Sequence, residues 1–545
     1  MSRKFWLATW SIALLAWLAA PPAQAAKAVR VHAITGVRIV VAPGKIVPEG
    51  TVVMRDGLIE AAGSGVKAPA DARLWDGKGL TVYAGLIDPY TVRATPELKD
   101  GDKAPQWANA NALVRPERDI LPWAGDAAAA KKLREAGYTT AAVSAKDGMF
   151  RGQGAVIDLG DGSAQDNLLR TGFAQTVTVK PLGGGRDNDE YPASLMGAVA
   201  LFRQTLSDAA WYSKAKSAYA KNPRQERLSY NAALESLQSA STGSQLVLFE
   251  TDDVLDALRD AHLAQEFKLK AALLGSGEEY KRLDDVKATG LAIVLPLDFP
   301  KGPKLNGDKD PNVEIEDLRH WDAAPENPKK LLAAGVDVSF TSYRLDDPKT
   351  ILPNLATAIK RGLTADQALA GVTTSPARFL GLQDRIGTVE AGKLANLVVV
   401  DGDLFVEKPK IREVWVEGNR YEIKDSKPAE IEPAGTWELT VKTADGRDIP
   451  GVLELKGKAD ALTGKIAAMG KSAEVTATVS ASNLEIGFEG AAFGQPGAFT
   501  MTLEINGDNA TGSGSSPSGA LTVTGSRTTK PSAGSTPPAS SGVAQ

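Results

Sequence analysis

The sequence has no cysteine and only three histidines among its 545 residues. Without cysteine, the chain cannot form a disulfide bond, a thiolate nucleophile or a metal site with cysteine ligands. Any catalysis must therefore use oxygen or nitrogen groups.

The chain also carries little net charge. Lysine and arginine total 62, and aspartate and glutamate total 66, which gives a formal net charge of -4. This weak charge gives no indication of a nucleic-acid or anionic-membrane partner. A hydrophobic share of 43% and a charged share of 23% are ordinary for globular proteins. The length suits about two to four domains with a large buried core.

The N-terminus has the pattern of a secretory signal. Arg3 and Lys4 precede an apolar run at residues 5–20, and the small-residue sequence AQA at 23–25 offers a cleavage site. An uncleaved membrane anchor is the alternative, but the run is shorter than the ~20 residues that a spanning helix needs. Because a cysteine-free exported chain needs no oxidative folding, we expect the mature protein in a bacterial periplasm, without a membrane span after cleavage.

Alternating and helical patterns divide the rest of the chain. Short alternating strands precede residue 84, and strands alternate with helices from there to residue 382, which is typical of βα units. About 300 residues of this pattern match the size of a (β/α)8 barrel. Alternating strands return after it and again after residue 434. Because the ends of a barrel lie near one another, the two flanks can join in one domain.

We therefore predict an α/β protein with a TIM-like (β/α)8 barrel, a composite β-sandwich domain formed by both flanks and a C-terminal antiparallel β-domain. The end of the chain has almost no large apolar residues and is expected to be disordered. The expected boundaries are a signal peptide at 1–25, the composite domain at 27–84 and 385–425, the barrel at 85–384, the C-terminal β-domain at 434–526 and the disordered tail at 527–545.

Four stretches carry a family resemblance: RDGLIEAAG, GLTVYAGLID, GLTADQALAGVTTSPARFLGLQDRIGTVEAGKLANLVVVDGDLF and VWVEGNRY. In this order they resemble the amidohydrolase superfamily, near its imidazolonepropionase-like and dihydroorotase-like periplasmic members. The resemblance covers residues 29–423 and leaves the C-terminal β-domain outside it. It implies a (β/α)8 barrel with a composite β-domain, the architecture that the strand and helix pattern predicts independently.

The resemblance also implies a metal site, from which this chain departs. Active members place Asp-x-His-x-His at the end of the first barrel strand, where two imidazoles bind a divalent metal. Here Asp88 is kept, but Tyr90 and Val92 stand at the histidine positions. A phenol with a pKa of about 10 is a poor ligand near neutral pH, and valine has no lone pair.

The family's later ligands are absent as well. It places a histidine at the ends of strands five and six and an aspartate at strand eight. These places correspond to Phe249 or Glu250, to Gly275 or Ser276, and to Ser342. The sequence therefore predicts no bound cofactor, whereas the family would bind one or two divalent metals such as zinc.

None of the three histidines offers a replacement. His32 precedes the barrel in a strand, His262 lies on a helix and His320 lies in a helical or turn segment. Barrel chemistry occurs at the carboxyl ends of the strands, where none of them is predicted. We expect all three to be packing or surface residues, with His320 as the exception to consider, since a loop can fold over the barrel mouth.

Two carboxylates do follow predicted barrel strands, Glu250 after QLVLF and Asp298 after AIVLPL. If both face the barrel mouth, they could act as a general acid and base or hold Ca²⁺ or Mg²⁺. Helix caps and loop ion pairs are the simpler explanation. Arg344 and Arg151 could clamp an anion, although exposed loop arginines more often have no such role.

Three functions fit these observations. The favoured one is a pseudoenzyme, an exported amidohydrolase-fold protein that has lost its binuclear metal site and acts as a binding or partner subunit. It would form a homo-oligomer, or a hetero-oligomer with an active paralogue. The second is an active hydrolase of C–N bonds, not peptide bonds, in cyclic amides with an atypical ligand set. The third is an envelope or carbohydrate-binding protein that uses Trp437 and Phe488 of the C-terminal β-domain.

Overall fold

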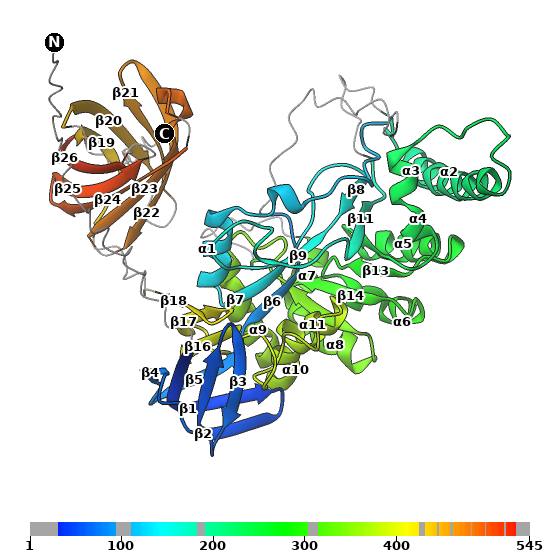
Figure 1. Cartoon of the computed structure of the whole chain (residues 1–545), viewed down its shortest axis with the longest axis horizontal. Coiled ribbons are helices and arrows are strands. Elements are labelled where there is room, and N and C mark those ends of the chain that lie inside the picture. Colours follow the sequence, from blue (N-terminus) through cyan, green and yellow to red (C-terminus); the bar gives the residue numbers. More distant parts are fainter. Residues whose placement is uncertain are drawn as a thin grey trace, which may run out of the picture. The chain divides into compact units, whose positions relative to one another are not determined.

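The chain folds into two compact units, Met1–Ile423 and Lys424–Gln545 (Figure 1). The expected signal segment and residues 530–545 of the expected tail lie outside the described residues. No helix of the described part is long and apolar enough to cross a membrane. The computed structural model describes residues 31–93, 109, 111–181, 191–302, 314–423, 431–443, 446–457, 462–480, 482–495, 497–516 and 519–529.

One sheet combines strands from both flanks of the barrel. β16 pairs with β5 in antiparallel fashion and so joins the two halves, in the order β18-β17-β16-β5-β1-β2-β3 with β4 beside β1. Asp56 and Gly57 both have positive φ and form the hairpin turn between β2 and β3. The strands are β1 (Val31–Ala42), β2 (Lys45–Arg55), β3 (Leu58–Gly63), β4 (Arg73–Asp76), β5 (Leu80–Ala84), β16 (Leu397–Asp401), β17 (Lys410–Val416) and β18 (Asn419–Glu422).

In the described part of the barrel region, seven parallel strands form two runs. β6 pairs with β7, and β11 to β15 form a continuous parallel run. Side chains at the end of β15 contact β6, as described below. The strands are β6 (Leu86–Thr91), β7 (Tyr138–Val143), β11 (Ala174–Thr178), β12 (Leu246–Glu250), β13 (Ala271–Leu274), β14 (Ala292–Pro296) and β15 (Val338–Thr341).

The third barrel position differs from the expected eight parallel strands. β8 (Phe150–Gln153) and β9 (Ala155–Asp158) form one segment that bends at Gly154. β9 runs antiparallel to β7 and β8 runs antiparallel to β11, so the segment bridges the two parallel runs. β10 (Leu168–Arg170) pairs with β9. A Cβ at Gly154 would lie 2.3 Å from the Phe173 ring, so the close packing of this ring requires glycine.

Helices connect the strands of the barrel, and several begin at side-chain caps. Asp126 caps α1, Asp253 caps α5, and Thr364 with Gln367 forms a capping box on α10. The helices are α1 (Ala127–Glu135), α2 (Leu195–Lys221), α3 (Ala232–Ser236), α4 (Gln238–Ser241), α5 (Val254–Glu266), α6 (Leu283–Ala288), α7 (Ile315–Ala323), α8 (Asn327–Ala333), α9 (Ile351–Lys360), α10 (Ala365–Val372) and α11 (Thr374–Phe379), with 3-10 turns at Leu121–Trp123, Glu279–Arg282, Ala324–Glu326 and Pro348–Thr350.

The C-terminal unit is a closed antiparallel barrel of eight strands, closed by pairing of β19 with β26. Alternate residues such as Trp437, Leu439 and Val523 are buried inside it. The expected tail begins too early, because β26 continues through Arg527 to Thr529 and the Arg527 guanidinium lies 4.5 Å from the Trp437 ring centroid. The strands are β19 (Gly435–Lys442), β20 (Asp448–Lys456), β21 (Thr463–Ala468), β22 (Lys471–Ser480), β23 (Asn483–Glu489), β24 (Ala498–Asn506), β25 (Asn509–Ser516) and β26 (Gly519–Thr529), with a 3-10 turn at Gly490–Phe493.

Candidate functional site

Glu250 is the centre of a polar cluster inside the barrel. It is the last residue of β12 and is 6% exposed. Its Oε2 atom accepts hydrogen bonds from Arg151 Nη1 at 2.5 Å and from the Tyr90 hydroxyl at 3.4 Å. Its Oε1 atom lies 3.6 Å from Lys180 Nζ. Side chains from β6, β8 and β12 therefore converge at the carboxyl ends of the barrel strands.

Arg151 is a buried strand residue, not the exposed loop residue that the sequence suggested. Its Nη1 atom also donates to the Tyr90 hydroxyl at 3.2 Å, and its Nε atom donates to the Gly148 carbonyl at 3.2 Å. Because β8 is only four residues long and contains a glycine, its strand character is not visible in the sequence pattern.

The charges of this cluster hold one another in their ionised forms. Burial alone would raise the pKa of Glu250, but Arg151, Lys180 and Arg344 together outweigh burial, and the pKa lies below its usual range. Burial would lower the pKa of Arg151, yet Tyr90 and Glu250 raise it above its ordinary value. Burial raises the pKa of Tyr90, so its phenol is neutral and available for hydrogen bonding.

Asp88 is a fully buried residue of β6, and its side chain faces the end of β15. Its Oδ1 atom lies 2.6 Å from the Thr341 hydroxyl, and its Oδ2 atom accepts a hydrogen bond from the Ser342 hydroxyl at 2.5 Å. Burial raises the pKa of Asp88, and the two hydroxyls oppose that rise. Ser342, which stands where the family has its strand-eight acid, therefore serves here as a hydrogen-bond donor to Asp88.

The structure shows how the residues at the family's strand-five and strand-six ligand positions are placed. Phe249 packs outward against Phe202, with ring centroids 5.7 Å apart, whereas Glu250 faces the barrel interior. At strand six, the backbone nitrogen of Gly275 donates to the Val294 carbonyl and that of Ser276 donates to Glu279 Oε1 at 2.6 Å. These two positions therefore have structural partners.

The remaining first-strand position, Val92, is half-buried and packs against the apolar cluster that contains Ile87 and Tyr90. It adds no polar atom from its side chain to the strand end.

Asp298 has different surroundings from Glu250. It is exposed after β14, and among the described residues no hydrogen bond or ion pair joins it to Glu250. Burial of part of its carboxyl and the nearby Asp346 raise the pKa of Asp298, and Arg344 and Lys301 oppose this. The two sequence-predicted carboxylates therefore differ in burial, with Glu250 buried and Asp298 exposed.

Two cations lie on the solvent side of the cluster. Arg344 has a φ of 68° and donates to the Thr251 carbonyl at 2.7 Å and to Asp252 Oδ1 at 3.3 Å. Lys180 lies 2.8 Å from Asp252 Oδ2. Lys180 was not predicted as a site residue, although it follows the apolar run FAQTVTV at a strand end, as Glu250 follows QLVLF.

The histidines lie elsewhere. His32 accepts a hydrogen bond from Trp75 Nε1 at 3.2 Å in the flank sheet, His262 is exposed on α5, and His320 lies 3.0 Å from the Tyr280 hydroxyl. Within the described ranges, no group of three or more histidine, aspartate and glutamate side chains could hold a metal ion. The strand-end residues do not fit the family's metal, since Arg151 neutralises Glu250 and hydroxyls hold Asp88.

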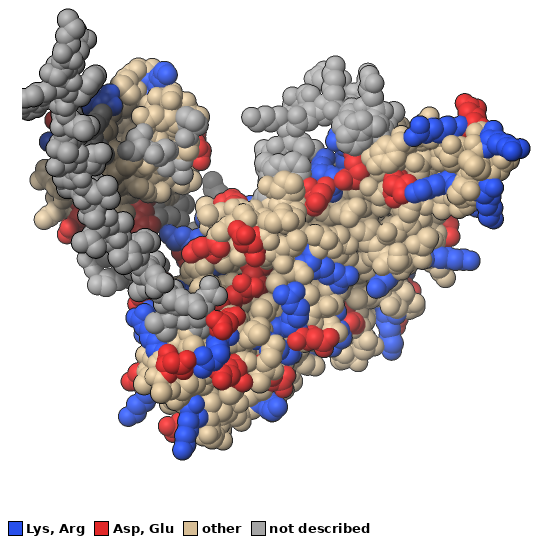
Figure 2. All heavy atoms as spheres, viewed as in Figure 1, with Lys and Arg blue, Asp and Glu red and all other residues tan. Residues whose placement is uncertain are grey.

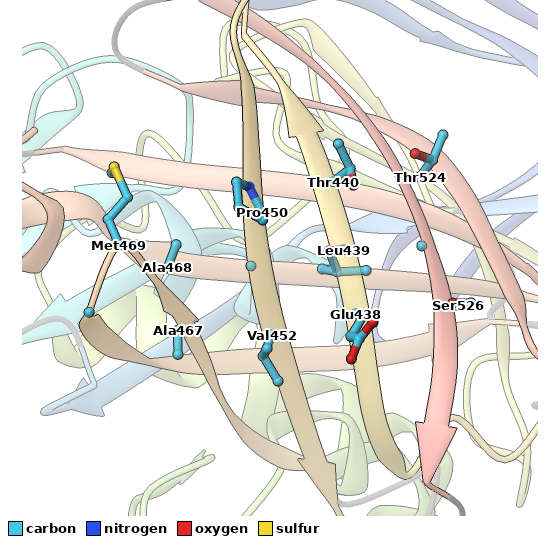
Figure 3. Close-up of a pocket in the computed structure, with 13 residues that line it drawn as sticks. Glu438, Leu439, Thr440, Pro450, Val452, Ala467, Ala468, Met469, Thr524 and Ser526 are labelled. Atoms are coloured by element: carbon cyan, nitrogen blue, oxygen red, sulfur yellow. The ribbon is translucent and has the colours of Figure 1, made fainter.

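The C-terminal unit has a separate groove of about 720 Å³ on its outer surface, which Figure 3 shows. It runs over β26, β19 and β20 to the turn at Met469, and Glu438 is the one charged residue that lines it. Trp437 is buried and donates to the Pro433 carbonyl at 2.8 Å, so it is part of the core. Phe488 stacks on Phe499 and contacts Phe493, and it is half-buried.

Comparisons with known proteins find partial matches to the amidohydrolase family and to imidazolonepropionases. Residues 325–440 match the sequence model of the amidohydrolase family. An imidazolonepropionase of Maricaulis maris is 31% identical over 172 residues, which are 30% of this chain and 37% of that relative. An imidazolonepropionase of Rhizorhabdus wittichii is 26% identical over 403 residues, covering 67% of this chain and 90% of that relative.

A solved structure supports the fold. An amidohydrolase from Thermotoga maritima superposes with a TM-score of 0.59 at 20% sequence identity, covering 72% of this chain and 99% of that chain. The chain matches only 37% of the length of the Maricaulis relative.

These relatives correct one expectation. Homologues such as imidazolonepropionase are metal-dependent, so the expectation that no cofactor is bound is wrong as an inference from this family. The strand-end residues described above still do not make a metal centre of the family's kind.

Proposed function

We propose that this chain, a diverged member of the amidohydrolase superfamily, binds a small anionic ligand at the barrel mouth without hydrolysing it. The observation that carries this proposal is the cluster of Tyr90, Arg151 and Glu250 at the strand ends. Export to the periplasm and assembly with itself or with an active paralogue belong to the same proposal.

The cluster is suited to binding rather than to proton transfer. A guanidinium stays protonated at all ordinary pH values, so Arg151 cannot act as a base. The Glu250 carboxylate is buried against that guanidinium, and its lowered pKa makes it a weak base. Asp88 is held by two hydroxyls away from solvent. Neither Glu250 nor Asp88 is thus placed to activate water.

Charge at the mouth favours an anion. In the network of ion pairs around Glu250, Arg151, Lys180 and Arg344 bring three positive charges, and Glu250 and Asp252 bring two negative charges; Asp298 is not part of this network. The Asp252 side chain is 50% exposed, and ion pairs with so exposed a carboxylate contribute little stability. A ligand carboxylate can therefore take the place of Asp252 beside Lys180 and Arg344. A cyclic amide that bears a carboxylate has this chemistry.

A second candidate is hydrolysis of C–N bonds, other than peptide bonds, in cyclic amides. It is favoured by the matched relatives, which are named imidazolonepropionases. It requires a ligand set different from the strand-end residues of the family.

Binding and turnover can be measured on the same protein. We expect calorimetry to detect binding of carboxylated cyclic amides and weaker binding of their neutral carboxamide analogues. Lys180→Gln should weaken binding about tenfold, since a charged hydrogen bond contributes roughly 1.5 kcal/mol. Lys270→Gln is the matched control, because Lys270 is exposed and precedes β13 at the opposite end of the barrel.

The same compounds should remain intact during incubation with the full chain in zinc- or manganese-supplemented buffer, followed by mass spectrometry. Ring opening that depends on protein concentration would overturn the binding proposal and support the hydrolase. Co-purification from periplasmic extract tests the partner role, and recovery of the chain alone would contradict a hetero-oligomer.

A further inference from the structure

The end of α2 carries a local positive charge that the whole chain does not. Residues 211–231 contain five lysine and arginine side chains and one glutamate, whereas the chain has a net charge of -4. The weak charge of the whole chain gave no indication of an anionic-membrane partner. We call these residues the basic tip. It extends over the last turns of α2 and the loop before α3.

One face of α2 presents this charge to solvent. Trp211, Lys214 and Lys221 are spaced by three and seven residues, so they share a face of the helix. Phe202 and Leu206 on the other face are buried in the core of the barrel unit. Trp211 is 59% exposed. Figure 2 shows lysine and arginine side chains gathered at this end of the helix, at the right of the view.

The loop of the basic tip is held against the helix. The backbone nitrogen of Asn231 donates to the Tyr212 hydroxyl at 3.4 Å, and Lys216 pairs with Glu235 of α3 at 2.5 Å. Tyr230, beside Asn231, is 66% exposed. Two large aromatic side chains, Trp211 and Tyr230, therefore stand exposed on the same basic tip.

Most of the positive charge is not neutralised within the protein. Among the described residues, no ion pair involves Lys214, Lys221, Arg224 or Arg227, and all four are exposed. Lysine and arginine beside unpaired aromatic rings suit a surface that is negatively charged and partly apolar. Anionic phospholipid headgroups attract clustered cations, and the amphipathic rings of tryptophan and tyrosine favour the headgroup level.

We propose that the basic tip docks this protein on an anionic phospholipid surface. The helix would lie against the headgroups through Trp211, Lys214 and Lys221, with Arg224 and Arg227 adding charge. This goes beyond the proposed function, because it concerns a surface of α2 and not the barrel mouth. A protein partner with an acidic surface is the competing occupant.

Vesicle sedimentation tests the proposal with the full chain. We expect sedimentation with phosphatidylcholine vesicles that contain 30% phosphatidylglycerol, a conventional anionic content, and no sedimentation with pure phosphatidylcholine. High salt should release the protein, because screening weakens exposed charges. The variant K214Q/K221Q/R224Q/R227Q should bind at least about tenfold more weakly, and Trp211→Ala should bind with intermediate strength.

The matched control is K132Q/K270Q/K287Q/K329Q, which removes the same charge from exposed lysines outside the basic tip. It should bind as tightly as the wild type, and thermal melting should show that all variants are folded. Equal binding to neutral and anionic vesicles would overturn the proposal. Equal losses of vesicle binding in the two quadruple variants would also overturn it. If the wild type binds no vesicles, the proposal is wrong and an acidic protein partner is the remaining occupant.

Discussion

Arg151 and Glu250 form an ion pair of 2.5 Å across the interior of the barrel, and the direction of β8 makes this pair available. Phe150 at the start of β8 pairs with Val177 near the end of β11. Because β8 is antiparallel, its first residues lie at the carboxyl ends of the parallel strands. The departure from eight parallel strands therefore delivers the cation to the mouth.

Removing one partner of this ion pair should strongly lower the stability of the fold. We expect Arg151→Met to lower the free energy of unfolding by about 3–5 kcal/mol, because Glu250 would remain buried without its cation. The double variant R151M/E250Q should recover part of the loss, since neither charge remains. Urea unfolding of the full chain, with separate probes for its two units, measures both effects.

The control for this prediction is Arg412→Met. Arg412 pairs with Asp401 at 2.8 Å, and both side chains are 42% exposed. Its replacement should lower the free energy of unfolding by less than about 1 kcal/mol, because exposed ion pairs are solvated and screened. A similar cost for Arg151 and Arg412 would contradict a strongly coupled buried pair.

Asp158 should make stability depend on pH. It is fully buried on β9, and burial, with a contribution from Glu417, raises its pKa to about 7 despite hydrogen bonds from Thr140 and Asn396. The unfolded state has a pKa of about 3.9. Between these values the folded state holds a proton that the unfolded state has lost. The free energy of unfolding should fall as pH rises through this window and level off above it.

Asp158→Asn imitates the protonated carboxyl and should flatten this dependence. Urea unfolding between about pH 4 and pH 8 measures the slope. Asp384→Asn, an exposed loop carboxyl, is the control and should leave the slope unchanged. Asp260 also has a pKa raised by burial to about 7, and its contribution remains in both variants. An unchanged slope in Asp158→Asn would refute the assignment.

The sequence predicted much of the fold because periodicity and turn residues are local signals. Strand alternation located the flanks, and a helix ending before Gly137 followed by a strand from Tyr138 corresponds to α1 and β7. Strand direction is not local. Nothing in the run MFRGQGAV distinguishes an antiparallel strand from a loop, so β8 and Arg151 were misread.

The candidate site was predictable only in part for the same reason. Glu250 and Asp298 both follow apolar strands, but the sequence does not state which side of the strand end each faces. Ser342 was recognised as a missing acid, whereas its hydrogen bond to Asp88 depends on β15 lying beside β6. Partners that lie far apart in the sequence, such as Arg151 and Glu250, require the tertiary structure.

Gly85 in the stretch AGLID is a packing requirement. A Cβ at this position would lie 2.2 Å from Thr139 Cγ2 in the buried layer between the flank sheet and the barrel. We expect Gly85→Ala to lower the free energy of unfolding by about 1–3 kcal/mol, because the added methyl group overpacks this layer. Gly65→Ala is the control, since a Cβ there meets nothing within 4 Å. Thermal and urea unfolding measure both, and equal stability of the two variants would contradict this role for Gly85.

Restoring histidines at the first strand should not restore the family's chemistry. In the variant Y90H/V92H, an imidazole would replace the phenol that lies 3.2 Å from Arg151 Nη1, and a nearby guanidinium disfavours a metal cation. Ser342 would still offer a hydroxyl where the family has an acid. We expect no hydrolysis of cyclic amides, with or without added zinc. Stability should fall by about 1–3 kcal/mol as the buried hydrogen bonds are lost.

The control for this variant is Tyr90→Phe, which keeps the ring and removes only the hydroxyl. It should lose the hydrogen bonds to Arg151 and Glu250 without adding a metal-binding group. Ring-opening assays and zinc titrations of both variants measure hydrolysis and metal binding. Comparison with Tyr90→Phe shows which changes come only from loss of the hydroxyl. Hydrolysis by Y90H/V92H above the level of Tyr90→Phe would mean that two histidines suffice beside Arg151. The buried cation would then be no barrier to the family's reaction.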